Sequence, residues 1–138
     1  MTKAKVEELI AQGEGDRVEF TISEKEKKIG ETLCAFCNDL PGHGLPVYLL
    51  IGVNDYGTIA GKSFDDEALR GIGDVRHRFT PRPSITVHQP VKFDDEGYVL
   101  VIEAHPSKIP PIRYRGKIMI RIGPRQETAS IEDERLLS

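Results

Sequence analysis

The sequence has little cysteine, no long hydrophobic run and no excess of positive charge. Its two cysteines cannot build a disulfide framework, so we expect an intracellular, reducing environment and a cytoplasmic location. No apolar run approaches the ~18 residues of a membrane-spanning helix, and no signal-peptide pattern precedes the first predicted helix. The net charge of −3 excludes a polycation, so any binding to nucleic acid must depend on a local basic surface.

The length of 138 residues indicates one domain, large enough for a hydrophobic core without metal or disulfide cross-links. The sequence contains neither an internal repeat nor a low-complexity linker. Its last residues, 133–138, still have a helical pattern. We therefore expect residues 1–138 to form a single domain that is the N-terminal part of a longer protein.

Hydrophobic periodicity predicts a mixture of helices and strands. Helices are expected at Lys3–Gln12, Lys25–Leu40, Asp65–Phe79 and from Ser130 onwards. Strands are expected at Arg17–Ile22, Val47–Val53, Thr58–Ala60, Ser84–Gln89, Val91–Phe93, Tyr98–Ala104 and Lys117–Gly123. The sum is an α+β fold, in which helices pack on a mixed β-sheet of five or six strands. We interpret Tyr98–Ala104 as an edge strand through which a homodimer can form.

The stretch of residues 23–61 organises the rest of the chain. Ser23 followed by Glu26 predicts a capping box at the start of its helix. Val47–Val53 is almost entirely apolar, which is typical of a strand buried on both faces. This strand ends in the polar turn Asn54–Gly57. Functional residues often lie in such a turn, because the rigid strand before it fixes the geometry of the loop.

Three carboxylates are candidate metal ligands: Glu14, Glu19 and Asp55. Glu14 lies in a glycine-flanked loop, Glu19 on the polar face of a strand, and Asp55 at the exit of the buried strand. If these two strands are neighbours, the three carboxylates can converge, and clustered carboxylate oxygens suit Mg²⁺ or Mn²⁺. The alternative is that they are ordinary surface acids, with Asp55 capping its own turn.

Basic residues are concentrated in the last third of the chain. Between residues 104 and 126 there is no acid, and the basic residues are Lys108, Arg113, Arg115, Lys117, Arg121 and Arg125. A second group near the end of the third predicted helix consists of Arg76, Arg78 and Arg82. This distribution predicts a surface that contacts DNA or RNA phosphates independently of base sequence. The alternative is a half-exposed strand at Lys117–Gly123, with isoleucines facing inward and basic residues facing solvent.

Two further motifs are weaker. Gly57–Ser63 resembles a phosphate-binding loop, but it has three residues before its Gly-Lys-Ser where the mechanism needs four. A turn followed by a short strand explains these glycines better. Cys34 and Cys37 have Cys-x-x-Cys spacing, but they lie in mid-helix and no second pair of ligands accompanies them. They are interpreted as buried structural cysteines.

The chain resembles the Schlafen-type Alba-like domain in four segments that lie in the family's order: Glu14–Phe20, Leu33–Asp39, Leu50–Gly61 and Tyr114–Gly123. Together these segments extend over nearly the whole chain. The resemblance implies an Alba-related α+β fold that binds DNA or RNA, as in bacterial transcriptional regulators and Schlafen proteins. Our first functional prediction is therefore a regulatory module that binds mainly the nucleic-acid backbone.

The resemblance also implies two alternatives. Some Schlafen proteins are metal-dependent RNases that use two glutamates and an aspartate, which by motif position fall on Glu14, Glu19 and Asp55. These would then be the catalytic residues and the Mg²⁺ or Mn²⁺ ligands of an endoribonuclease. The third prediction is a regulator that binds ATP through Gly57–Ser63. Thr21 departs from the family because lysine is common there, and Asn54 departs because an acid is frequent there, so the family's acidic position is either 54 or 55.

Overall fold

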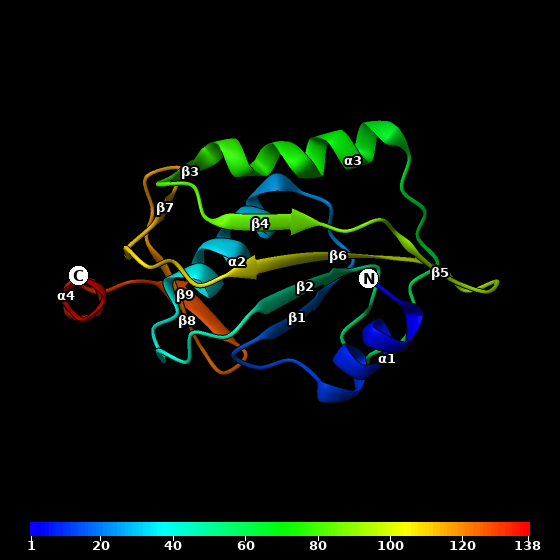
Figure 1. Cartoon of the computed structure of the whole chain (residues 1–138), viewed down its shortest axis with the longest axis horizontal. Helices are drawn as coiled ribbons and strands as arrows, with labels where there is room; N and C mark the ends of the chain where they lie inside the picture. The colour runs from blue at the N-terminus through cyan, green and yellow to red at the C-terminus, as the bar shows by residue number, and fades with distance from the viewer.

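A mixed β-sheet with the strand order β1–β2–β6–β4 forms the centre of the computed structural model, which describes residues 1–138 (Figure 1). Its strands are β1 (Val18–Thr21), β2 (Val47–Ile51), β6 (Gly97–His105) and β4 (Ser84–Val87), with β5 (Val91–Phe93) paired to the start of β6. β1 runs parallel to β2, and the other pairs are antiparallel. The structure confirms the predicted α+β class and the mixed sheet.

Strand β2 is buried on both faces, as its apolar sequence predicts. Val47, Leu49 and Ile51 point into the larger hydrophobic core, whereas Tyr48 and Leu50 point into a second core on the opposite face. This alternation results from the two-residue repeat of a strand, which sends successive side chains to opposite faces. The predicted short strand after β2 is reduced to a single bridge between Val53 and Ile59.

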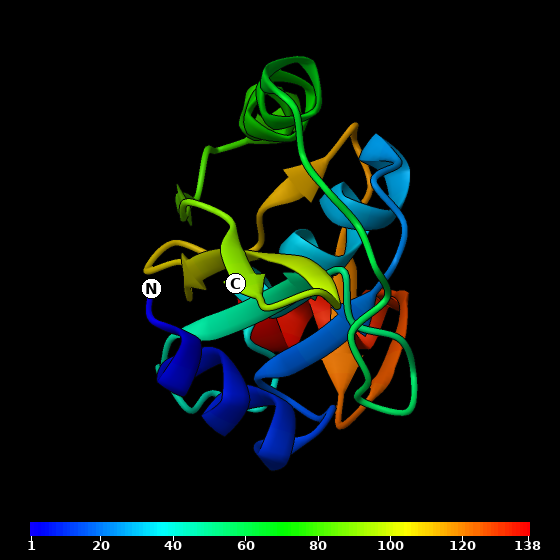
Figure 2. The ribbon, with the colours of Figure 1, turned by 90° about the vertical axis from the view of Figure 1, so that its right-hand side faces the viewer.

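The two cores are closed by two helices on opposite faces of the sheet: α1 (Lys3–Gln12) and α2 (Glu26–Asn38) (Figure 2). Helix α1 buries Val6 and Leu9, and α2 buries one whole side, including Leu33 and Phe36. Both helices occur where the apolar spacing predicts them. None of the helices combines the length and the apolar character that crossing a membrane requires.

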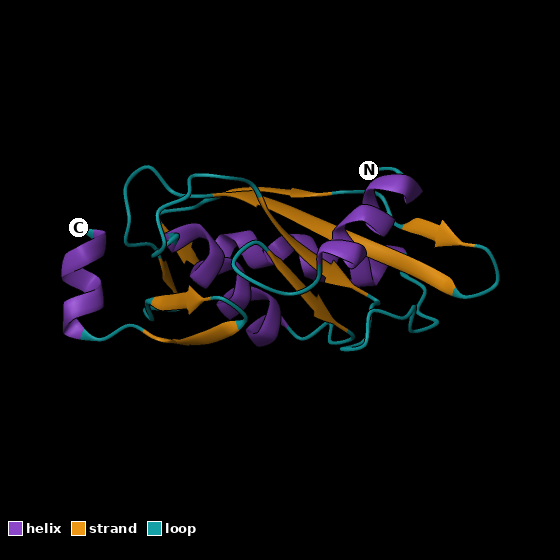
Figure 3. Cartoon of the chain, turned by 90° about the horizontal axis from the view of Figure 1, so that it is seen from below, coloured by secondary structure: helices purple, strands orange, loops and turns teal.

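The remaining elements surround α2. They are α3 (Asp66–Gly73), the 3₁₀ helix η1 (Asp74–Arg78), β3 (Phe79–Thr80), β7 (Arg113–Tyr114), β8 (Met119–Ile122), β9 (Arg125–Thr128) and α4 (Ile131–Leu137). β3 pairs with β7 and β8 pairs with β9, each as a small antiparallel sheet. Helix α4 lies at one end of the molecule (Figure 3). It begins with the expected capping box, in which Ser130 and Asp133 bond each other's backbone N–H.

The buried carboxamide of Asn38 attaches the segment before β7 and strand β8 to α2. Its oxygen accepts the N–H of Ile112 at 2.7 Å, and its nitrogen donates to the carbonyls of Ile112 at 3.1 Å and Met119 at 2.8 Å. Since unpaired polar groups in the interior are costly, these bonds fix where the two segments cross the helix. The basic residues of the last third are thereby brought to α2.

Three local expectations were wrong. The capping box of Ser23 with Glu26 does not form, because Ser23 bonds the N–H of Lys25 and the Glu26 side chain contacts basic residues instead. The polar face of β1 is buried rather than exposed, with Glu19 covered by other elements. Strand β6 is interior, paired on one side with β2 and on the other with β4 and β5, so it cannot supply the edge on which the homodimer was based.

Candidate functional site

A pair of glutamates lies where the loop after α1 meets β1. The Oε2 atom of Glu14 accepts the backbone N–H of Phe20 at 3.3 Å, and its carboxyl group is a neighbour of that of Glu19. Partial burial and this neighbouring carboxyl raise the pKa of Glu14 to about 7, and the charge of Asp55 acts in the same direction. Neighbouring carboxyl groups resist ionising together, because two adjacent negative charges repel each other.

Two cations hold the other member of this pair. Arg121 Nη2 lies 2.7 Å from Glu19 Oε1, and Lys28 Nζ lies 2.5 Å from Glu19 Oε2. Burial by itself would raise the pKa of Glu19, but its contacts with Glu14, Lys28 and Arg121 lower it below the ordinary value. The pKa of Glu19 is therefore lowered and that of Glu14 is raised, so Glu19 is the more acidic member of the pair.

Arg121 is an interior residue, contrary to the expectation that it lies on an exposed basic face. Its side chain is 2% exposed, its guanidinium lies 4.6 Å from the ring centre of Phe36, and its Nε donates to the carbonyl of Gly15 at 2.8 Å. Ile118 and Ile120 face inward as predicted, but Met119 and Arg121 on the other face are buried too, and Ile122, which was expected to face inward, is 58% exposed. Ile118 and Ile120 pack against Leu137, while Arg121 faces α2 and β1. A residue enclosed in this way is not available to phosphates at the surface.

The turn after β2 brings Asp55 to the same place. Asn54 Oδ1 accepts the N–H groups of Tyr56 at 3.0 Å and Thr58 at 3.3 Å, so its amide shapes the turn, and the charge of the exposed Asp55 acts on Glu14. A cavity of about 190 Å³ opens here, lined by Glu19, Phe20, Thr21, Ile22, Lys28, Asn54 and Asp55. The structure thus brings the three predicted carboxylates to one region.

The three carboxylates, as placed, are not arranged as a set of metal ligands. No group of three or more acidic, histidine or cysteine side chains is arranged to hold a metal ion. Both oxygens of Glu19 already accept from cations, and the Lys28 ammonium stands beside the carboxyl pair where a cation would bind. In this arrangement, Lys28 and Arg121 neutralise the carboxyl pair.

A second carboxylate, Glu26 in the first turn of α2, forms ion pairs with two exposed arginines. Arg115 donates to both of its oxygens, at 2.7 and 2.8 Å, and Arg78 Nε donates at 3.2 Å. The Tyr114 hydroxyl also donates to it. The bonds from Arg115, Tyr114 and Arg78 lower the pKa of Glu26 to about 2. Tyr114 reaches this position because α2 has a glycine, Gly30, beneath its ring.

Five basic residues lie on the first half of α2 or contact its carboxylates, and we call this group the α2 band. It consists of Lys27, Lys28, Arg78, Arg115 and Lys117. Lys117 Nζ lies 3.3 Å from Glu31, and a cavity of about 330 Å³ separates the turn after β7 from the helix. Because Lys28 also contacts Glu19, the band adjoins the carboxyl pair. Its cations outnumber the carboxylates Glu19, Glu26 and Glu31 that they contact.

The other predicted basic residues lie elsewhere. Arg113 points toward α4, with its Nη2 atom 3.9 Å from Glu134. Arg125 is on β9, 3.7 Å from Glu127. Arg76 lies on η1 and lines a different cavity. The predicted set is therefore divided among the α2 band, the α4 contact, β9, η1 and the interior.

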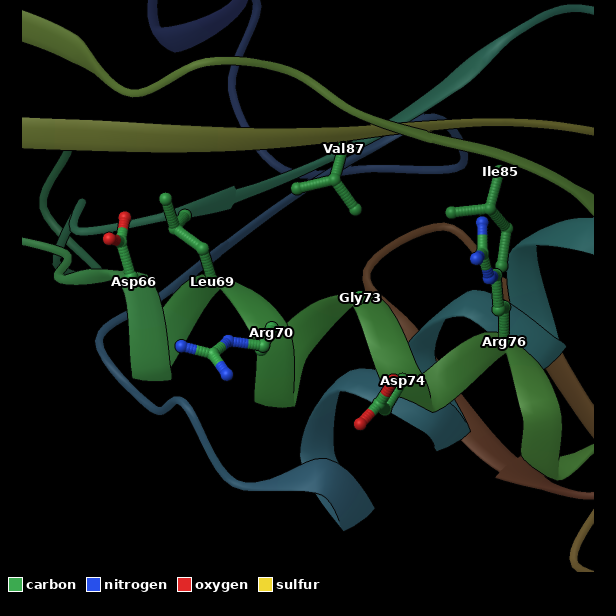
Figure 4. A pocket seen from close by; sticks show the side chains of 8 residues that line it. All are labelled: Asp66, Leu69, Arg70, Gly73, Asp74, Arg76, Ile85 and Val87. Carbon is green, nitrogen blue, oxygen red and sulfur yellow. The ribbon is translucent and has the colours of Figure 1, made fainter.

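The largest cavity, of about 620 Å³, lies between α3 and β4, away from the carboxyl pair (Figure 4). Ile85 and Val87 point from β4 toward the helix, and Leu69 points from α3 toward the strand. Its charged lining residues are Asp66, Arg70, Asp74 and Arg76. Because acids and bases are balanced there, the cavity has no excess of positive charge.

Neither of the two weaker motifs, Gly57–Ser63 and the pair of Cys34 and Cys37, forms the kind of site that its pattern suggests. Residues 57–63 do not open a helix, as a phosphate loop must, and Lys62 is held by Glu24 at 2.7 Å. Cys34 and Cys37 are both buried, and burial raises the pKa of Cys34 to about 11 and that of Cys37 further, so both stay thiols. The interpretation of the cysteines as structural is confirmed.

Sequence reasoning missed two residues of this region, Lys28 and Glu26. A signal for Lys28 was present, because it precedes the inward-facing Ile29 on α2 and so falls at the edge of the buried face. Glu26 was assigned to a cap because that motif is local. Its true partners lie 52 and 89 residues away in the sequence, beyond the reach of any local pattern.

Comparison with known proteins identifies the family of this chain. The family model described as "Schlafen, AlbA_2" matches residues 14–130. Among solved structures, the DIP2311 protein from Corynebacterium diphtheriae is similar, with a TM-score of 0.59 and 19% sequence identity. The match covers 91% of this chain and 30% of that protein, so the chain spans about a third of the length of this relative. A search of curated proteins finds no match.

Proposed function

The chain belongs to the Schlafen AlbA_2 family, and from this premise we propose that it is a regulatory module that binds DNA or RNA through the α2 band. The single observation that carries the proposal is that Lys27, Arg115 and Lys117 line one cavity beside the first half of α2, with Lys28 on the same helix. Several cations close together can contact more than one phosphate of a nucleic-acid backbone.

Exposure supports the role of these cations. The side chains of Arg115 and Lys117 are each 53% exposed, so a phosphate can approach them without unfolding any element. A phosphate offers the same bidentate geometry to Arg115 that the Glu26 carboxylate offers in the free protein. Exchange of one oxyanion for the other makes binding depend on charge, with little readout of the bases.

The test measures the affinity of the chain for labelled single-stranded and double-stranded DNA and RNA across a range of salt concentrations. For the double variant Arg115→Ala/Lys117→Ala we expect weaker binding and a shallower plot of log affinity against log salt. The slope should fall by about 0.7 to 0.9 for each phosphate contact that is lost.

Arg125→Ala is the matched control, because Arg125 is an exposed arginine outside the α2 band. Its affinity and salt slope should equal those of the wild-type chain. If the chain binds no oligonucleotide at low salt, or if Arg125→Ala weakens binding as much as the double variant does, the proposal is wrong.

A metal-dependent endoribonuclease is the second candidate, and the observation that favours it is that the carboxyl groups of Glu14 and Glu19 are neighbours, with Asp55 near enough to raise the pKa of Glu14. The residues as placed do not fit a metal ion, so no catalytic step is assigned to one. The test is incubation of structured RNA with the chain and Mn²⁺. Cleavage that disappears in Glu14→Gln supports this candidate, and cleavage that persists in that variant, or no cleavage at all, removes it.

A further inference from the structure

The turn after β2 carries the most exposed large apolar or aromatic side chain of the molecule. Tyr56 is 94% exposed, and its ring makes no cation–π or aromatic contact within the chain. Tyrosines usually bury most of the ring and leave only the hydroxyl in water. The ring of Tyr56 therefore contributes little to the stability of this fold.

The backbone that presents this ring is firmly held. Asn54 accepts the N–H of Gly57 through its carbonyl at 2.9 Å and donates its own N–H to Thr58 at 3.0 Å, in addition to the bonds of its side chain. Gly57 packs closely against helix α1, because a Cβ atom there would lie 3.3 Å from Ile10. The ring is thus presented to solvent from a fixed position.

The ring is carried by a turn that borders a cavity. Asn54 and Asp55, which directly precede Tyr56, line the 190 Å³ cavity beside the carboxyl pair. Ile22, which is also exposed, lines the same cavity from the segment after β1. Lys28 contributes a cation to its wall. An apolar side chain and an ammonium group therefore line this cavity, and Tyr56 directly follows two of its lining residues.

We infer that Tyr56 stacks on an unpaired base of a single-stranded nucleic acid whose adjacent phosphate is bound by Lys28, at the end of the α2 band. The inference rests on the proposed function and specifies which form of nucleic acid this end of the site takes. Stacking needs a base that is free of its partner strand, so the contact selects single-stranded segments over duplex. It adds affinity without adding a charge, so it leaves the salt dependence unchanged.

The first experiment compares Tyr56→Ser with Tyr56→Phe by binding to the same oligonucleotide as a single strand, as a duplex and as an abasic single strand. We expect Tyr56→Ser to weaken single-strand binding about 10-fold, within the range that removal of one stacked aromatic produces. Duplex and abasic binding should not change, and Tyr56→Phe should bind like the wild type. The salt slope should be the same in all three proteins.

The second experiment uses the absence of tryptophan from the sequence. Tyr56→Trp introduces a single indole, and a base stacked on it should quench its fluorescence as single strand is added. Ile131→Trp is the control, because Ile131 is exposed on α4, away from the 190 Å³ cavity. Its fluorescence should stay constant over the same titration.

The outcomes separate the inference from the function on which it rests. If the wild-type chain binds oligonucleotides and Tyr56→Ser binds them equally well, or loses duplex and single-strand binding in parallel, the stacking inference is overturned and the α2 band proposal stands. If the wild-type chain binds none of the three oligonucleotides, the proposed function fails and the inference fails with it. The Tyr56 variants leave the core intact, so thermal unfolding at the wild-type temperature confirms that the comparison is between folded proteins.

Discussion

Glu19 and Glu26 lie on either side of the connection from β1 to α2, and each accepts hydrogen bonds from two basic side chains. They differ in burial. The Glu19 side chain is 11% exposed and its partner Arg121 is 2% exposed, whereas Glu26 is 33% exposed and Arg115 is 53% exposed. The same kind of ion pair is thus buried and structural in one region, and is exposed and able to exchange partners in the other. A charge pair far from water cannot lose one partner without a large penalty, but a pair in water can.

Removal of Arg121 tests this contrast most strongly. We expect Arg121→Ala to lower the free energy of unfolding by about 3–5 kcal/mol, because it leaves the buried Glu19 carboxylate without its closest guanidinium and uncovers Phe36. Urea denaturation followed by circular dichroism measures this change. Arg125→Ala, on the adjacent strand but exposed, should change stability by less than about 0.5 kcal/mol. Equal effects of the two variants would show that the buried pair of Arg121 and Glu19 does not stabilise the fold.

The exposed region depends on close packing beneath it, at Gly30. A Cβ atom on Gly30 would lie 2.1 Å from Cε1 of Tyr114, so Gly30→Ala forces the ring and the adjacent Arg115 away from Glu26. We expect a loss of about 1–3 kcal/mol in stability, as is usual when a packed site receives an extra methyl group. Gly71→Ala is the control, because a Cβ on Gly71 in α3 meets nothing within 4 Å.

Gly71→Ala should leave stability unchanged or increase it by up to about 1 kcal/mol, since alanine favours a helix more than glycine does. Thermal unfolding of the two variants gives the comparison. If Gly30→Ala were as stable as Gly71→Ala, Tyr114 would not need its place on α2.

Charge removal at Glu26 sharpens the surface side of the contrast. If nucleic-acid phosphate replaces this carboxylate, Glu26→Gln should raise affinity about 2- to 5-fold, because Arg115 and Arg78 no longer have a competing anion. Its effect on stability should stay below about 1 kcal/mol, as for other exposed pairs. Fluorescence anisotropy at constant salt measures the affinity. A loss of affinity would mean instead that Glu26 orients the arginines for binding.

The smallest expected effect is the pH dependence of Glu14. Its pKa is about 7 in the folded chain and 4.5 as the ordinary value, so the folded state holds a proton that the unfolded state has lost between these pH values. Stability from this group is therefore greatest at low pH and declines as pH rises toward 7.

Since Glu14 is partly exposed, we expect this decline to be below about 1 kcal/mol. Urea denaturation of the wild type and of Glu14→Gln at about pH 5 and about pH 8 measures it, because the glutamine variant should lack this component of the pH dependence. Identical pH dependence in the two proteins would contradict the raised pKa of Glu14.

Much of the architecture can be predicted from the sequence by local rules. Helix α1 has the bounds that its periodicity predicts, the burial of β2 on both faces agrees with its apolar run, and the capping box of Ser130 is written in four consecutive residues. In each case the physical cause is short-range: a helical or strand repeat, or a side chain that bonds its neighbour's backbone.

The position of the charged side chains was decided only by the tertiary structure. The polar face of β1 and the basic face of β8 both resemble solvent-exposed strands in the sequence, yet Glu19 and Arg121, 102 residues apart, bury each other. Glu26 likewise leaves its local cap for Arg115, 89 residues away. Such pairs form only when the fold brings both members together, as it does for Glu19 and Arg121 in the interior. Amphipathic patterns therefore predict which face of an element is polar, whereas the packing of distant segments determines whether that face meets solvent.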